Sequence, residues 1–190
     1  MRLRTTREKR IFYVKITLRW IVYYLLIFMG YIYMTTGTWR KPVILLPLAL
    51  AIAVNNNQYG SVVTGAVCGF LIDIACGKLF GYNAVILAFF CIVISLLFEF
   101  YLKNKFVNYM ILTAAASFIQ CWLDYKFYYQ MWKYENVHRI FTGYTLRIWI
   151  YTMISAVIAY LLIKLANHFL MPREHLSFNE VITEKSQQKP

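Results

Sequence analysis

The chain has 190 residues, of which 61% are hydrophobic and 15% charged, and it carries a net charge of +12. Soluble domains contain roughly 25% charged residues, so the composition excludes an ordinary soluble domain and indicates one membrane domain with room for about six spans. The positive charge alone would be compatible with a nucleic-acid partner. We expect no such partner, because the cations gather at the N-terminus and beside apolar runs, where anionic lipid and cytoplasmic loops account for them.

Three regions follow from the distribution of charge. Residues 1–15 form a basic leader, which we expect in the cytoplasm and in contact with anionic lipid. Residues 16–171 form the membrane domain, and residues 172–190 form a polar tail that we also expect in the cytoplasm. The predicted fold is an all-α integral membrane protein, a bundle of about six transmembrane helices with an N-in/C-in topology. The predicted spans lie at 16–34, 43–54, 60–77, 82–102, 106–123 and 145–165.

The second apolar run, 43–54, is too short for an ordinary span. As a helix it would cover about 18 Å, against a hydrocarbon thickness of roughly 30 Å. Pro42 precedes the run and Pro47 interrupts it, and proline kinks or ends a helix. We predict a short, kinked span; the alternatives are a span lengthened by its flanking residues and a re-entrant segment.

The third predicted span carries small residues and one acid at every fourth position. The repeat consists of Ser61, Gly65, Gly69, Asp73 and Gly77. On a helix this spacing places them on one stripe, where small side chains let a second helix approach closely. We predict a helix-packing and partner-binding surface, which meets either a partner's span or an adjacent span of the same chain. Asp73 is a functional candidate, because an acid inside the bilayer is costly.

Two further charges share the predicted depth of Asp73. Asp124 ends the fifth predicted span and Arg147 begins the sixth, so the N-in/C-in topology puts all three toward the outer face. A planar guanidinium suits carboxylate pairing, and the three residues form a candidate intramembrane charge cluster. In the alternative, Asp124 caps an exposed helix end and Arg147 extends to the headgroups. Arg19 and Glu99 are a second candidate pair, at the inner face.

The sequence offers no arrangement typical of catalysis. The cysteines lie within apolar segments and form no Cys-x-x-Cys pair. No nucleophile with a base, no phosphate-binding loop and no metal-ligand spacing occurs. We therefore predict a non-enzyme that holds no cofactor and no metal.

The stretch from Gly69 to Ala84, GFLIDIACGKLFGYNA, resembles the rod shape-determining protein MreD family. That family has a small-residue third span with a Gly-x-x-x-Asp step. A glycine-containing turn then leads into the fourth span, and Gly81 and Asn83 stand at this turn here. The similarity extends over about residues 40–125.

The resemblance implies a multi-pass protein of the bacterial plasma membrane. The implied function is that of a non-enzymatic scaffold of the cell-elongation machinery, regulating cell shape and lateral peptidoglycan synthesis. Such a protein would bind the bitopic membrane protein MreC and link MreB filaments, directly or indirectly, to cell-wall synthases. The alternative is a substrate-binding S component of an energy-coupling-factor vitamin transporter, which would need an outward pocket lined by polar and aromatic groups.

Overall fold

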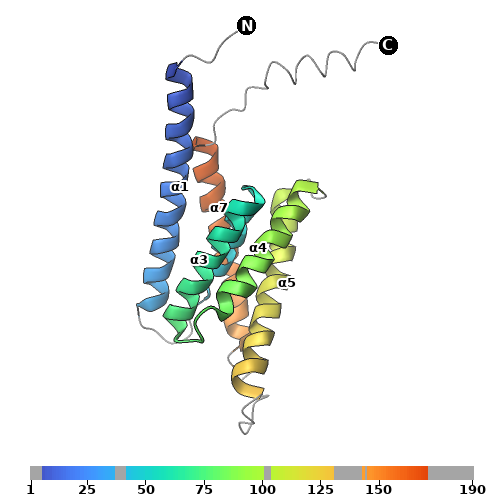
Figure 1. The fold of residues 1–190 in the computed structure, drawn as a ribbon. Helices are drawn as coiled ribbons and strands as arrows, with labels where there is room; N and C mark the ends of the chain where they lie inside the picture. Colours follow the sequence, from blue (N-terminus) through green and yellow to red (C-terminus); the bar gives the residue numbers. More distant parts are fainter. Residues whose placement is uncertain (1–5, 37–41, 101–103, 131–142, 144, 171–190) are drawn as a thin grey trace, which may run out of the picture.

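A computed structural model describes residues 6–36, 42–100, 104–130, 143 and 145–170 (Figure 1). These residues form helices and contain no strand, so the predicted all-α fold is confirmed. The beginning of the predicted leader and the whole tail at 172–190 lie outside the described residues. The helices are α1 (Thr6–Thr35), α2 (Leu45–Ala53), α3 (Gln58–Cys76), α4 (Tyr82–Phe100), α5 (Lys105–Tyr125), the π-helix η1 (Lys126–Gln130) and α7 (Leu146–Leu170).

Five helices, α1, α3, α4, α5 and α7, are long and apolar enough to cross a membrane. Large apolar side chains point outward from them, among them Phe28 of α1, Phe89 of α4 and Ile158 of α7. Apolar surface of this extent is unfavourable in water and favourable among lipid chains. The protein is therefore a multi-pass membrane protein, as its composition predicts.

Helix α2 differs from the predicted second span, because its helical part is shorter. It has nine residues, all of them buried, and would extend only about 14 Å. It contacts α1, α3, α4, α5 and α7, so the other helices surround it. Pro47 lies in its first turn, where a backbone N–H has no partner within the helix. Non-helical backbone at either end of α2 is tolerated at membrane depth because protein encloses it.

The helices alternate in direction (Figure 1). Helices α1, α3 and α5 run downward in the view of Figure 1, and α4 and α7 run upward. Helix α1 thus begins at the end of the bundle where α7 finishes, which we call the upper end. The lower end is the one where α3 turns into α4.

The turn between α2 and α3 forms a polar junction at the upper end. The backbone oxygen of Asn56 accepts a hydrogen bond from Ser95 of α4 (3.0 Å), and its side-chain oxygen accepts one from Arg19 of α1 (3.0 Å). Gln58, at the start of α3, donates to Glu99 of α4 (3.0 Å). Arg19 and Glu99 therefore bind separate neutral amides of this turn, and the predicted pair between them is not formed.

Candidate functional site

The small-residue stripe of α3 packs against α4 of the same chain. Ser61, Gly65, Gly69 and Asp73 are all buried. A Cβ atom at Gly69 would lie 2.3 Å from Ala84 Cα, and one at Gly65 would lie 3.0 Å from the backbone oxygen of Leu87. Glycine at these positions therefore lets the two backbones touch, which is how small residues hold membrane helices together. Of the two predicted alternatives, the structure has the adjacent span of the same chain.

Gly77 has a different role from the rest of the stripe. It is exposed, and a Cβ atom there would meet nothing within 4 Å. Its φ of 61° is left-handed, and it ends α3 as a C-cap. Lys78 N then donates to the backbone oxygen of Asp73 (3.0 Å). Gly81 also has a positive φ, 95°, so the predicted turn depends on glycine at both positions.

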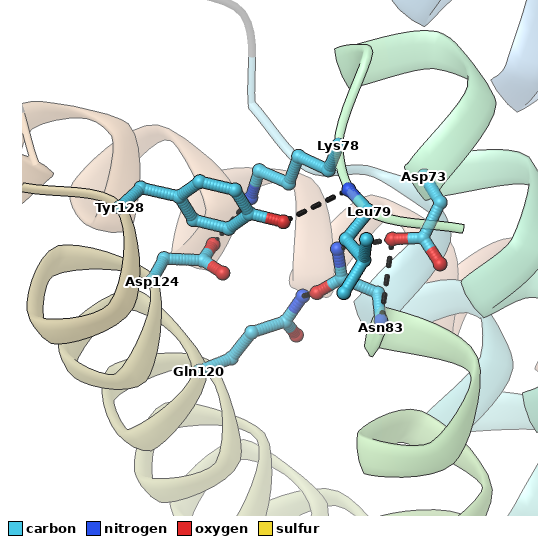
Figure 2. A network of polar contacts seen from close by, with 7 residues as sticks. All are labelled: Asp73, Lys78, Leu79, Asn83, Gln120, Asp124 and Tyr128. Atoms are coloured by element: carbon cyan, nitrogen blue, oxygen red, sulfur yellow. Dashed lines mark hydrogen bonds and ion pairs between the residues drawn. The ribbon is translucent and has the colours of Figure 1, made fainter. Parts of the chain in front are cut away.

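Asp73 holds the turn from inside (Figure 2). One carboxylate oxygen accepts from Gly81 N (2.8 Å), and the other accepts from Asn83 N (3.2 Å) and Asn83 Nδ2 (2.7 Å). The side chain of Asp73 is only 1% exposed, so these three N–H donors replace the water that a carboxylate would otherwise bind. Gln120 Nε2 of α5 donates to Asn83 Oδ1 (2.6 Å), which extends the network to a third helix.

A second set of contacts fastens the same turn to the end of α5 (Figure 2). Lys78 Nζ forms an ion pair with Asp124 Oδ2 at 2.5 Å. Leu79 N donates to the hydroxyl of Tyr128 (3.0 Å), which η1 brings back toward the turn. Tyr82 stacks on Phe127, with ring centroids 5.2 Å apart. The π-helix that continues α5 therefore supplies aromatic contacts to the start of α4.

The charge of Lys78 is stabilised in this position. Burial lowers the pKa of Lys78, but the charge of Asp124 and the hydrogen bond to it outweigh burial, so the pKa lies above its ordinary value. The lysine is therefore protonated at neutral pH. Its ammonium group also lies 5.7 Å from the ring centroid of Tyr128, within cation–π range.

The structure brings two members of the predicted charge cluster into one network and leaves the third outside it. Asp73 and Asp124 both hold the turn between α3 and α4, whereas Arg147 is exposed at the start of α7. Among the described residues, the cation paired with Asp124 is Lys78. The physical reason is the left-handed cap at Gly77, which reverses the chain so that Lys78 reaches α5.

The sequence pattern does not single out three residues of the network: Lys78, Gln120 and Tyr128. The position of Gln120 is recognisable from the sequence, because it lies one helical turn before Asp124 and the two give an otherwise apolar helix a polar edge. Lys78 shares the predicted outer zone with Arg147, so depth alone could not choose between the two cations. No sequence pattern indicates the role of Tyr128, because its hydrogen bond with Leu79 depends on the π-helix η1.

The chemistry of this network suits fixing helices in place. It consists of amides, phenols, one ammonium and two carboxylates, and both carboxylates accept from nitrogen donors of the same chain. Within the described residues no group of three or more metal-ligating side chains occurs. The network joins α3, α4 and α5 across a single turn and stabilises their packing.

Five long apolar helices around a short buried one, tied by a polar network at one turn, define an α-helical multi-pass membrane protein. The family model for rod shape-determining protein MreD matches residues 10–171. The chain therefore belongs to the MreD family, which confirms the resemblance found in its third span. No curated protein and no solved structure matches the chain. Membership in this family supports a role in rod shape determination and a place in the shape-determining machinery.

Proposed function

We propose that the protein is a non-enzymatic scaffold of the bacterial cell-elongation machinery, located in the plasma membrane. It regulates cell shape and lateral peptidoglycan synthesis by holding other membrane proteins together. The observation that carries this proposal is the family match over residues 10–171. The packing of the bundle supports it, because Asp73, Asn83 and Gln120 bond to one another across the turn and Lys78 pairs with Asp124. Of the buried polar atoms in this network, only Gln120 Oε1 and Asp124 Oδ1 have no hydrogen-bond partner.

The proposed partners are an MreC-like bitopic membrane protein and, directly or indirectly, MreB filaments and cell-wall synthases. The stripe on α3 is already covered by α4, so a partner's span must meet an outward face of the bundle. Outward faces offer large apolar side chains on several helices, including Phe28, Phe89 and Ile158. Such side chains favour helix association by dispersion contacts when the partner's surface is complementary.

We expect crosslinks to the MreC-like partner from an outward face and none from the interior. A diazirine-bearing amino acid is placed singly at Phe28, Phe89 and Ile158, with the buried Ile72 of α3 as the control. Each variant is expressed in cells depleted of the wild-type protein. The cells are scored for rod shape and then irradiated, and the crosslinked proteins are identified. The exposed Ile74 of α3 and Ile111 of α5 extend the set to all five long helices. Rod-shaped cells that yield partner adducts only from Ile72, or from none of these outward positions, would contradict the proposed binding mode.

The N-in/C-in orientation is part of the proposal, with the basic leader on anionic lipid at the cytoplasmic face. Its test uses a variant without the native cysteines. A thiol at Thr5 should be shielded from an impermeant reagent in intact cells and labelled after lysis. A thiol at Leu79, which is exposed at the lower end, should be labelled in intact cells. The reverse result at the two positions would invert the topology.

A further inference from the structure

A second polar cluster lies at the upper end, where α1 meets α7. Tyr23 of α1 is fully buried, and its hydroxyl donates to Oδ1 of Asn167 on α7. Arg19 lies one helical turn before Tyr23, with its guanidinium carbon 5.8 Å from the centre of the tyrosine ring. Three polar side chains from two helices therefore lie together near the end of the bundle.

This cluster has buried donors without acceptors. Arg19 Nη2 donates to Asn56 Oδ1 (3.0 Å), but its Nε is buried and has no hydrogen-bond partner. Asn167 is only 8% exposed, and its Nδ2 has no partner either. In the orientation of this amide, Oδ1 accepts from Tyr23 and the unpartnered atom is the N–H donor. Buried N–H donors are costly unless an acceptor meets them.

The charge around the cluster is positive. Lys15 lies one turn before Arg19 on α1, and Lys164 lies about one turn before Asn167 on α7; both side chains are exposed. The carboxylates that the structure describes are engaged elsewhere: two belong to the turn network at the lower end, and Glu99 accepts from Gln58. Arg19 therefore has no carboxylate partner among the described side chains.

We propose that the α1–α7 contact at the upper end binds the phosphate of an anionic phospholipid headgroup. Arg19 and the amide of Asn167 hold the phosphate. Lys15 adds charge on the side nearer the upper end, and Lys164 adds charge about one turn closer to the middle of the bundle. Arg19 lies about 9 Å along α1 from Tyr13, where the apolar segment begins. This places it near the boundary of headgroups and hydrocarbon, within the reach of an arginine that extends outward. The guanidinium fork also matches a phosphate with two parallel hydrogen bonds.

Apart from Lys15, this site is separate from the basic leader, and the test distinguishes the two. The full-length protein is purified in neutral detergent, and binding of phosphatidylglycerol and of phosphatidylcholine with the same acyl chains is measured by native mass spectrometry. The wild type should prefer phosphatidylglycerol. Arg19→Gln should weaken that binding about fivefold, the effect of one cation close to the membrane surface. Arg10→Gln, which removes one charge from the leader, should leave it within twofold.

Equal losses in Arg19→Gln and Arg10→Gln would place the attraction in the leader and overturn the proposal, and so would equal binding of the two lipids. If inorganic phosphate displaces the lipid at matching concentration, the site recognises soluble phosphate instead.

Arg19→Gln also removes the hydrogen bond to Asn56, so a second variant controls for an effect on folding. Arg19→Lys, which keeps the charge, should bind more tightly than Arg19→Gln. On the wild type, a phosphatidylglycerol carrying a photoreactive headgroup should label peptides of α1 and α7; labelling elsewhere alone would contradict the site.

Discussion

Gly69→Ala should prevent accumulation of the folded protein. The added Cβ would lie 2.3 Å from Ala84 Cα, 2.5 Å from Ala84 N and 2.6 Å from Asn83 O, all of them backbone atoms of α4. No side-chain rotation relieves such contacts, so α3 and α4 must separate. Overpacking typically costs about 1–3 kcal/mol, and we expect this substitution to exceed that range because two backbones are forced apart. Fluorescence-detected size exclusion of a tagged protein measures the folded fraction.

Gly30→Ala is the matched control. Gly30 also lies within a membrane-spanning helix, but its Cβ would come no closer than 3.5 Å to a flexible leucine side chain, which is ordinary van der Waals contact. Alanine has the higher helix propensity, so this variant should accumulate at least as well as the wild type. Normal accumulation of Gly69→Ala would mean that α3 and α4 are not in backbone contact at this level.

The stripe on α3 illustrates what a sequence pattern predicts about packing. The four-residue spacing of Gly65 and Gly69 indicates a close helix contact, because the helical period alone places both on one face. In the structure both face backbone atoms of α4. The same spacing includes Gly77 in the stripe, although Gly77 serves as a left-handed cap beyond the helix. Periodicity cannot distinguish the two roles, since it carries no information on where a helix ends.

The pairing of charges required tertiary information. The sequence pattern predicts that Asp73 and Asp124 lie at matching depth, and in the structure both hold one turn. The sequence pattern also favours Arg147 as the partner of the two carboxylates, because arginine pairs well with carboxylates. The structure has Lys78 instead, since a tight turn brings this lysine across to α5. The buried position of α2 likewise depends on how five other helices pack around it, which its own apolar sequence does not specify.

The location of the network bears on the proposed scaffold. It fixes α3, α4 and α5 at the lower end, while the junction around Asn56 ties α1, α3 and α4 at the upper end. These contacts hold α3 and α4 at both ends, and α1 and α5 at one end each. A scaffold needs surfaces of fixed geometry, because binding to a preorganised face does not include the entropy cost of ordering that face.

The ion pair at the turn should show strong coupling in a double-mutant cycle. The side chains of Lys78 and Asp124 are 22% and 20% exposed, so Asp124→Asn or Lys78→Gln alone leaves a mostly buried charge without a partner. Breaking a buried pair costs about 3–5 kcal/mol, and partial exposure reduces this to about 1–3 kcal/mol. The double variant Lys78→Gln/Asp124→Asn leaves two neutral amides and should be more stable than the sum of the single losses indicates.

The control cycle uses Asp73→Asn and Arg147→Gln. Asp73→Asn should be destabilising by itself, because an amide N–H₂ would face a backbone donor of the turn. Arg147 is exposed and outside the network, so its substitution should have little effect and the two changes should add within about 0.5 kcal/mol. Thermal unfolding of the purified variants in one detergent provides all the values. Coupling between Asp73 and Arg147, together with additivity between Lys78 and Asp124, would restore the cluster expected from sequence and refute the pairing in the structure.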